Sequence, residues 1–174
     1  MGFSLLALGM CVWPTGCGSR PAHVADKVAA GVNQAHSSAS TLERMPDFNL
    51  RDTDGHEVTS AQFRGKAILL DFWGTWCAPC KQEMPGYEEL YQRYKDRGLV
   101  VIGIAADSDP SLVAEFAKKL KITYPLLING MDVQRYGVEG LPTTMLIDRN
   151  GFIRKKVVGF EYTAVFEIAL SKLL

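Results

Sequence analysis

Histidine is scarce in this sequence, and cysteine is scarce outside one motif. The 174 residues include three histidines, none of them after His56, and four cysteines. A structural zinc site needs more Cys or His ligands than the chain can gather around Cys77 and Cys80, because Cys11 and Cys17 lie in an amino-terminal leader. We therefore expect neither a structural metal nor a cofactor.

An excess of one charge is lacking as well. The sequence carries 19 acidic and 19 basic side chains, so its formal net charge is zero, and it has no run of like charges. Domains that bind nucleic acid usually present a basic patch or stripe. We therefore expect no nucleic acid among the partners, which must be sought through the chemistry of particular residues.

The apolar segment at the amino terminus is too short to span a bilayer comfortably. Residues 1–12 are apolar and uncharged, and a stretch of small residues follows them. This leader resembles the end of a bacterial lipoprotein signal, in which Cys17 becomes the first mature residue and carries lipid. It departs from that pattern because no Lys or Arg precedes Arg20 and because Pro14 stands where Leu is usual. An ordinary cleaved signal or a short membrane anchor remains open.

The rest of the chain divides into a tether and one domain. Residues 18–41 are rich in Ala, Ser and Gly and have no strong periodicity, which is typical of a flexible linker. Residues 42–174 are long enough for one well-packed core. We therefore expect a leader over 1–17, a tether over 18–41 and a folded domain over 42–174.

Two cysteines separated by two residues stand where an apolar strand passes into a helix. Residues 68–73 form an apolar run of strand length, and residues 81–94 carry apolar or aromatic side chains at helical spacing. Cys77 is therefore predicted at the start of the helix, where that position and Pro79 expose it, and Cys80 one turn inside. Unpaired N–H groups at a helix start favour the thiolate of Cys77, and the short spacing allows Cys80 to close a ring with it. A reversible disulfide is the leading hypothesis.

Two carboxylates are candidates for moving the proton of Cys80. Asp71 lies in the strand before the motif, where burial would raise its pKa. Glu83 lies three residues after Cys80 on the same helical face. The simpler alternatives are that Asp71 is an ordinary strand-end acid and that Glu83 is a solvated acid on the helix surface.

The coarse pattern of the domain alternates strands with helices, which favours a mixed α/β sheet that is covered on both faces. A hairpin is expected first, because Asp54 and Gly55 form a turn dipeptide between two short apolar segments. The expected strands are 48–50, 57–59, 67–72, 99–105, 125–128, 143–147 and 152–158, and the expected helices are 81–94, 110–120 and 162–174.

At this point the residues carry a resemblance to a known family. Asp71-Phe72-Trp73 with the motif through Cys80, followed by Tyr136-Gly137-Val138 and Gly140-Leu141-Pro142-Thr143, resembles the thioredoxin fold over residues 45–174. The leading hairpin and the inserted helix-strand segment over 108–130 are similar to the membrane-tethered TlpA/ResA-type thiol-disulfide oxidoreductases of bacteria.

The resemblance implies several properties of the site. Leu141-Pro142 would be a cis peptide bond that faces the cysteines, and the backbone of Leu141 would pair with an extended substrate. Cys77 would attack a substrate disulfide, Cys80 would resolve the mixed disulfide, and Asp71 or Glu83 would handle the proton. Trp76 is a candidate for an apolar rim against the substrate.

The resemblance also implies partners and a location. The protein would act outside the cytoplasm, in the periplasm or on the outer face of the cell membrane, as a reductant in cytochrome c maturation or a related thiol pathway. Its substrate would be a protein disulfide such as that of apocytochrome c. A membrane thiol-disulfide donor would supply electrons, because the compartment itself is oxidising.

Two other classes remain open. A peroxiredoxin shares the fold and the hairpin, but it requires a Thr three residues before its reactive Cys, and Thr75 is two residues before Cys77. A copper-delivery module on this fold usually has a wider Cys spacing and a late histidine, which this sequence lacks.

Overall fold

The computed structural model describes residues 42–174; the predicted leader, the tether and Cys17 lie outside this part of the chain. The strands are β1 (Asn49–Asp52), β2 (Glu57–Thr59), β3 (Ala67–Trp73), β4 (Leu99–Ala105), β5 (Leu126–Ile128), β6 (Thr143–Ile147) and β7 (Ile153–Val158). The α-helices are α1 (Ala78–Tyr94), α2 (Pro110–Leu120) and α3 (Thr163–Leu170), and short 3-10 helices are η1 (Ser60–Phe63), η2 (Lys95–Arg97) and η3 (Asp132–Tyr136).

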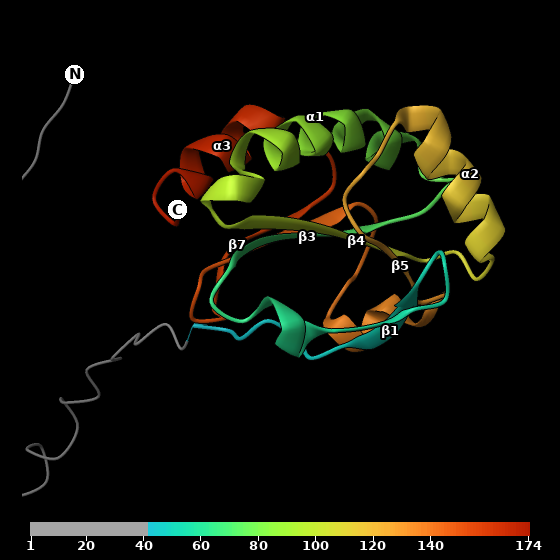
Figure 1. The fold of residues 1–174 in the computed structure, drawn as a ribbon, viewed down its shortest axis with the longest axis horizontal. Coiled ribbons are helices and arrows are strands. Elements are labelled where there is room, and N and C mark those ends of the chain that lie inside the picture. Colours follow the sequence, from blue (N-terminus) through green and yellow to red (C-terminus); the bar gives the residue numbers. More distant parts are fainter. Residues whose placement is uncertain (1–41) are drawn as a thin grey trace, which may run out of the picture. The chain divides into compact units, whose positions relative to one another are not determined.

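The strands form one mixed sheet, as predicted (Figure 1). Its order is β2-β1-β5-β4-β3-β6-β7, with β3, β4 and β5 parallel to one another and the other neighbouring pairs antiparallel. The parallel strands β3 and β4 are almost wholly buried, which explains why they read as continuous apolar runs. The predicted leading hairpin is β1-β2, and its turn places Gly55 at φ 86°.

Both faces of the sheet are covered, but by different elements. All three α-helices lie on the same side of the sheet in Figure 1, and residues of α1, α2 and α3 pack in one cluster with Leu69 and Trp73 of β3. The opposite cluster contains Leu70 and Phe72 of β3, with residues from η1, η3 and the hairpin. Side chains of β3 therefore alternate between two cores, and Asp71 shares the helix side with Leu69 and Trp73.

The sheet register brings the cysteine motif beside the predicted cis-proline. Phe72, near the end of β3, pairs with Thr143 at the start of β6. The segment that leads from β3 to α1 and the segment that enters β6 through Pro142 therefore lie side by side, where β3 ends and β6 begins. Among residues 42–174, no helix has the length and apolar character needed to cross a membrane.

Candidate active site

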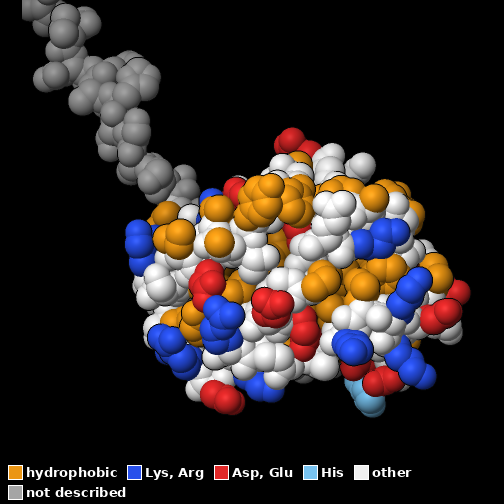
Figure 2. Space-filling model, turned by 90° about the horizontal axis from the view of Figure 1, so that it is seen from above, with side chains coloured by type: hydrophobic (Ala, Val, Ile, Leu, Met, Phe, Trp, Pro, Cys, Tyr) orange, Lys and Arg blue, Asp and Glu red, His pale blue; other side chains and the backbone are white. Residues whose placement is uncertain are grey.

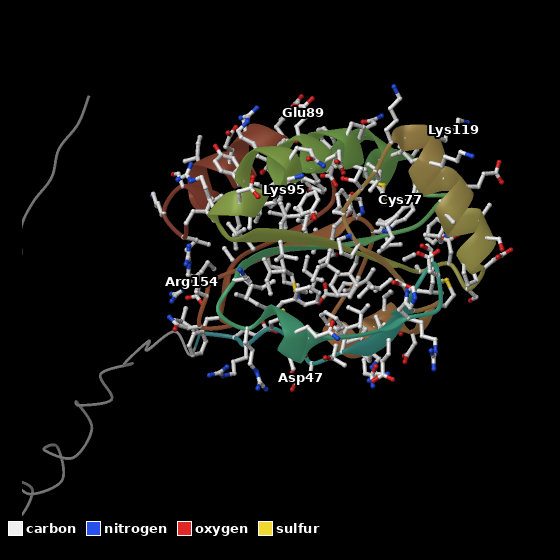
Figure 3. All side chains as sticks on the ribbon, in the orientation of Figure 1. Asp47, Cys77, Glu89, Lys95, Lys119 and Arg154 are labelled. Atoms are coloured by element: carbon white, nitrogen blue, oxygen red, sulfur yellow. A yellow bond between two sulfur atoms is a disulfide. The ribbon has the colours of Figure 1, made fainter. Side chains whose placement is uncertain are left out.

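Cys77 and Cys80 form a disulfide at the amino-terminal end of α1, where the labelled Cys77 lies in Figure 3. Cys77 is the N-cap residue with extended backbone, Pro79 occupies the first turn, and the Cys80 N–H donates to Cys77 Sγ over 3.3 Å. The predicted helix start is therefore confirmed. The unpaired N–H groups of a first helical turn, of which the Cys80 N–H contacts Cys77 Sγ, favour the thiolate of Cys77 once the disulfide is reduced.

Both sulfur-bearing residues are buried in the oxidised protein. Cys77 is 5% exposed and Cys80 is fully buried, so the expectation that the helix start exposes Cys77 is wrong. The physical reason is that an N-cap side chain turns back over the helix, here into the cluster that Leu141 also borders. Trp76 and Ala78 are the exposed residues of the motif instead; Trp76 is 60% exposed, and its indole folds over Gly74.

A carboxylate on the neighbouring strand end fixes the loop before Cys77. The Thr75 N–H donates to Asp107 Oδ2 over 2.9 Å, and the Thr75 hydroxyl donates to Asp107 Oδ1 over 2.6 Å. Asp107 is 8% exposed and lies two residues after the end of β4. Sequence reasoning missed this contact, because Thr75 follows β3 and Asp107 follows β4, and no local sequence pattern links residues 32 positions apart.

Asp71 is fully buried in the middle of the sheet. Desolvation, followed by the nearby charge of Glu83, raises the pKa of Asp71 well above its ordinary value near 3.8. Its only hydrogen-bond partner among the described residues is the Thr144 hydroxyl, which lies 3.3 Å from Oδ1, and Oδ2 has none. The alternative of an ordinary acid at a strand end with a solvent partner is therefore wrong.

Glu83 is also buried, at 2% exposure, on the same face of α1 as Cys80 and Tyr87. The backbone N–H of Glu161 donates to Glu83 Oε1 over 2.6 Å, because the loop that precedes α3 covers this turn of α1. Burial raises the pKa of Glu83 from 4.5 to about 7, against the lowering effect of the Glu161 N–H and the Tyr87 hydroxyl. The alternative of a solvated surface acid is wrong.

Two buried hydroxyls, those of Thr144 and Tyr87, extend from Asp71 toward the face of α1 that carries Glu83, and sequence reasoning assigned neither a role in the site. The Tyr87 hydroxyl lies 3.0 Å from Thr144 Oγ1, and both side chains are buried. Burial and the charges of Asp71 and Glu83 raise the pKa of Tyr87, so this hydroxyl stays protonated. The helical period places Tyr87 among the aromatic positions of the helix, four residues after Glu83, where it offers no ion-pair partner; the signal that sequence reasoning did not use is that its hydroxyl can hydrogen-bond.

The Leu141–Pro142 peptide bond is cis, as the resemblance implied. The Gly159 N–H donates to the carbonyl of Pro142 over 2.8 Å, which ties the end of β7 to the entrance of β6. Within residues 42–174, no group donates to or accepts from the backbone of Leu141. Leu141 itself is partly buried and borders both core clusters.

A disulfide at the start of a helix that follows a central parallel strand, beside a cis-proline, defines a thioredoxin-fold thiol-disulfide oxidoreductase. Comparison with known proteins agrees with this class. The chain belongs to the AhpC/TSA family, whose model matches residues 42–156.

Individual relatives point to the same chemistry. The chain is 41% identical over 116 residues to the thiol-disulfide oxidoreductase ResA of Geobacillus kaustophilus, covering 66% of this chain and 67% of the relative. It is 37% identical over 133 residues to ResA of Bacillus thuringiensis, covering 75% and 77%. A solved thiol:disulfide interchange protein of the thioredoxin family from Chlorobium tepidum shares 27% identity at a TM-score of 0.69, covering 76% of this chain and 96% of that one. The protein is an enzyme of this type, with Cys77 and Cys80 as its cysteine pair.

Proposed function

We propose that the protein reduces disulfides in other proteins outside the cytoplasm, as a reductant in cytochrome c maturation or a related thiol pathway. The observation that carries the proposal is the Cys77–Cys80 disulfide at the start of α1, bordered by exposed Trp76 and by the backbone of Leu141, which has no hydrogen-bond partner among residues 42–174. The resemblance to TlpA/ResA-type proteins supports the pathway, and the relatives named ResA support the chemistry.

The proposed reaction starts from the reduced pair. The Cys77 thiolate attacks one sulfur of a substrate disulfide, and the other substrate sulfur leaves as a thiolate. Cys80 then attacks Cys77 Sγ in the mixed disulfide, releases the second substrate thiol and forms the Cys77–Cys80 disulfide. The substrate gains two electrons that the enzyme loses, and a membrane thiol-disulfide donor returns them.

The proton of Cys80 must leave before Cys80 can attack. Asp71 and Glu83 are the proposed acceptors, because both are buried acids on the helix side of the sheet with raised pKa values. Titration of the Cys77 thiolate by alkylation against pH, in Asp71→Asn and Glu83→Gln variants, tests their coupling to the thiols. If neither substitution changes the titration curve, the acids do not serve the cysteines.

An extended substrate segment is proposed to lie between Trp76 and Leu141-Pro142. The free N–H and C=O of Leu141 would pair with the substrate backbone, and the indole of Trp76 would cover an apolar residue beside the substrate disulfide. Figure 2, viewed from the helix side, shows hydrophobic side chains gathered between scattered Lys, Arg, Asp and Glu, without a patch of one charge. Such a face suits a polypeptide better than a polyanion.

The location is proposed from the sequence of the leader. Lipid on Cys17 would hold the domain at the membrane, where a membrane donor can reach the disulfide. Mass spectrometry of the protein from the membrane fraction tests this point, and an unmodified Cys17 in the intact mature protein would contradict it.

Trapping tests the function as a whole. In a Cys80→Ser variant the mixed disulfide cannot resolve, so substrates and the donor should accumulate as covalent complexes with Cys77 in the cell of origin. A Cys77→Ser/Cys80→Ser double variant is the matched control and should trap nothing. Recovery of only small thiols on Cys77, with no protein, would refute a protein substrate.

Peroxide chemistry is less well supported. The Thr75 hydroxyl and N–H are both bound to Asp107 at 2.6 and 2.9 Å, so neither is free to hold a peroxide beside Cys77. A copper function is also less well supported, because within residues 42–174 no histidine lies near the motif: His56 is exposed on the hairpin turn and hydrogen-bonds Asp52.

A further inference from the structure

Four buried polar side chains lie between β3, β6 and α1. Asp71 comes from β3, Thr144 from the paired position on β6, and Tyr87 and Glu83 from one face of α1. Thr144 Oγ1 lies 3.3 Å from Asp71 Oδ1 and 3.0 Å from the Tyr87 hydroxyl. All four are at most 2% exposed.

At the Glu83 end of this group, one carboxylate oxygen has no hydrogen-bond partner among the described residues. Glu83 Oε1 accepts the Glu161 N–H, but Glu83 Oε2 is buried and has no hydrogen-bond partner among the described residues. Tyr87 lies one helical turn after Glu83 on the same buried face of α1, and its hydroxyl is one of the groups that lower the pKa of Glu83, which makes it the candidate donor for that oxygen. Glu161, which bonds Glu83, belongs to a loop that is partly exposed to solvent.

The order of donors in such a series depends on where the proton is. When Asp71 is protonated it can donate to Thr144, Thr144 to Tyr87, and Tyr87 to Glu83. When Asp71 is ionised every hydrogen bond reverses, because a hydroxyl can both donate and accept. Two buried acids that repel each other are costly to ionise together. The state in which either Asp71 or Glu83 keeps a proton is therefore more stable than the state in which both are ionised.

We propose that Tyr87 and Thr144 are positioning residues that conduct a proton between Asp71 and Glu83 and thereby prepare Asp71 to accept the proton of Cys80. The Asp71 proton passes to Thr144 Oγ1, the Thr144 proton to Tyr87 Oη, and the Tyr87 proton to Glu83 Oε2. Each hydroxyl loses one proton and gains one, so the net result is ionised Asp71 and protonated Glu83. This inference rests on the proposed function and assigns a route to its proton step.

Other titratable groups face this route. Glu161 lies next to Glu83 and raises its pKa, while the buried Tyr124 hydroxyl is near Asp71 but has no hydrogen-bond partner among the described residues. No Lys, Arg or His side chain of residues 42–174 lowers the pKa of Asp71 or Glu83 and so offsets the effect of their burial. Tyr124 therefore offers a buried hydroxyl that is close to the route but not part of it.

The test separates the two sulfur steps with dithiobis-nitrobenzoate (DTNB) and stopped-flow absorbance. Attack by reduced Cys77 releases a first thionitrobenzoate, and attack by Cys80 on the mixed disulfide releases a second. In Tyr87→Phe and Thr144→Val variants we expect the second release to slow about tenfold at neutral pH, while the first is unchanged. At alkaline pH the slowing should disappear, because hydroxide removes the Cys80 proton directly.

Matched variants distinguish proton conduction from packing. Tyr124→Phe removes a buried hydroxyl outside the route and should leave both releases unchanged, and Thr144→Ser keeps the hydroxyl and should retain the fast second release. The proton route would be overturned if the second release were unchanged in Tyr87→Phe. It would also be overturned if Tyr124→Phe slowed the second release equally, or if the slowing in Tyr87→Phe were the same at every pH. Loss of the first release in the unsubstituted protein would instead contradict the proposed function itself.

Discussion

Glu83→Gln should stabilise the fold at alkaline pH. The pKa of Glu83 is 4.5 in an ordinary environment and about 7 in the folded protein, and at about 1.36 kcal/mol per pKa unit this difference corresponds to ~3 kcal/mol. Glutamine has no charge to desolvate, and its side-chain oxygen can still accept the Glu161 N–H. The expected gain in the free energy of unfolding is therefore about 1 to 3 kcal/mol above pH 7.

The sign of the pH dependence follows from proton binding. Between 4.5 and about 7 the folded protein holds the Glu83 proton more tightly than the unfolded chain does. The contribution of the protonated side chain to stability is fully present below this window and is lost as the pH rises through it. The difference between Glu83→Gln and the unsubstituted protein should thus be small near pH 4 and reach its full size near pH 8.

Urea unfolding of the oxidised protein, followed across this pH range, measures the effect. Glu89→Gln is the matched control, because Glu89 is exposed on the same helix, and its substitution should change the stability little at any pH. A Glu83→Gln variant that is no more stable than the unsubstituted protein at pH 8, or whose difference does not vary with pH, would refute the reasoning.

Two further predictions concern packing around the site. Gly103→Ala places a Cβ 2.5 Å from Leu126 Cδ2 and should lower the free energy of unfolding by about 1 to 3 kcal/mol in urea titration, whereas Gly140→Ala, whose Cβ would have no neighbour closer than 3.6 Å, should change it little; equal effects would contradict the close packing. Asp107→Ala leaves the Thr75 N–H and hydroxyl without their acceptor and should cost about 1 to 3 kcal/mol by the same measurement, so an unchanged unfolding midpoint would show that this contact does not hold the loop.

The fold was predictable where its cause is local. The apolar runs predicted β3 and β4 nearly to the residue, and α2 begins at Pro110 and ends at Leu120 as expected, with Asp109 as its N-cap accepting the Ser111 N–H over 2.9 Å. The closing helix was predicted to begin at Tyr162 and continue to the last residue, but α3 ends at Leu170. The apolar pattern continues beyond that point, and periodicity alone does not mark where a helix frays.

The site was predictable only in part, for a physical reason. The cysteine pair is a local motif, and the cis-proline came from the resemblance, since the residues alone favour a trans bond. The burial of Glu83 depends on Glu161, which lies 78 residues further along the chain. The link from Asp71 to Tyr87 likewise depends on sheet register, which brings Thr144 between them. Contacts of this range have no signature in local spacing.

The two buried acids have no purely structural justification. Asn in place of Asp71 could still bond Thr144, and Gln in place of Glu83 could still accept the Glu161 N–H, without the free energy that burying a charge costs. What an amide cannot do is exchange a proton. An acid whose pKa is raised to about 7, one helical turn from a disulfide, is poised to exchange one at neutral pH. The proposed proton transfer during thiol-disulfide exchange would account for the stability that these acids cost.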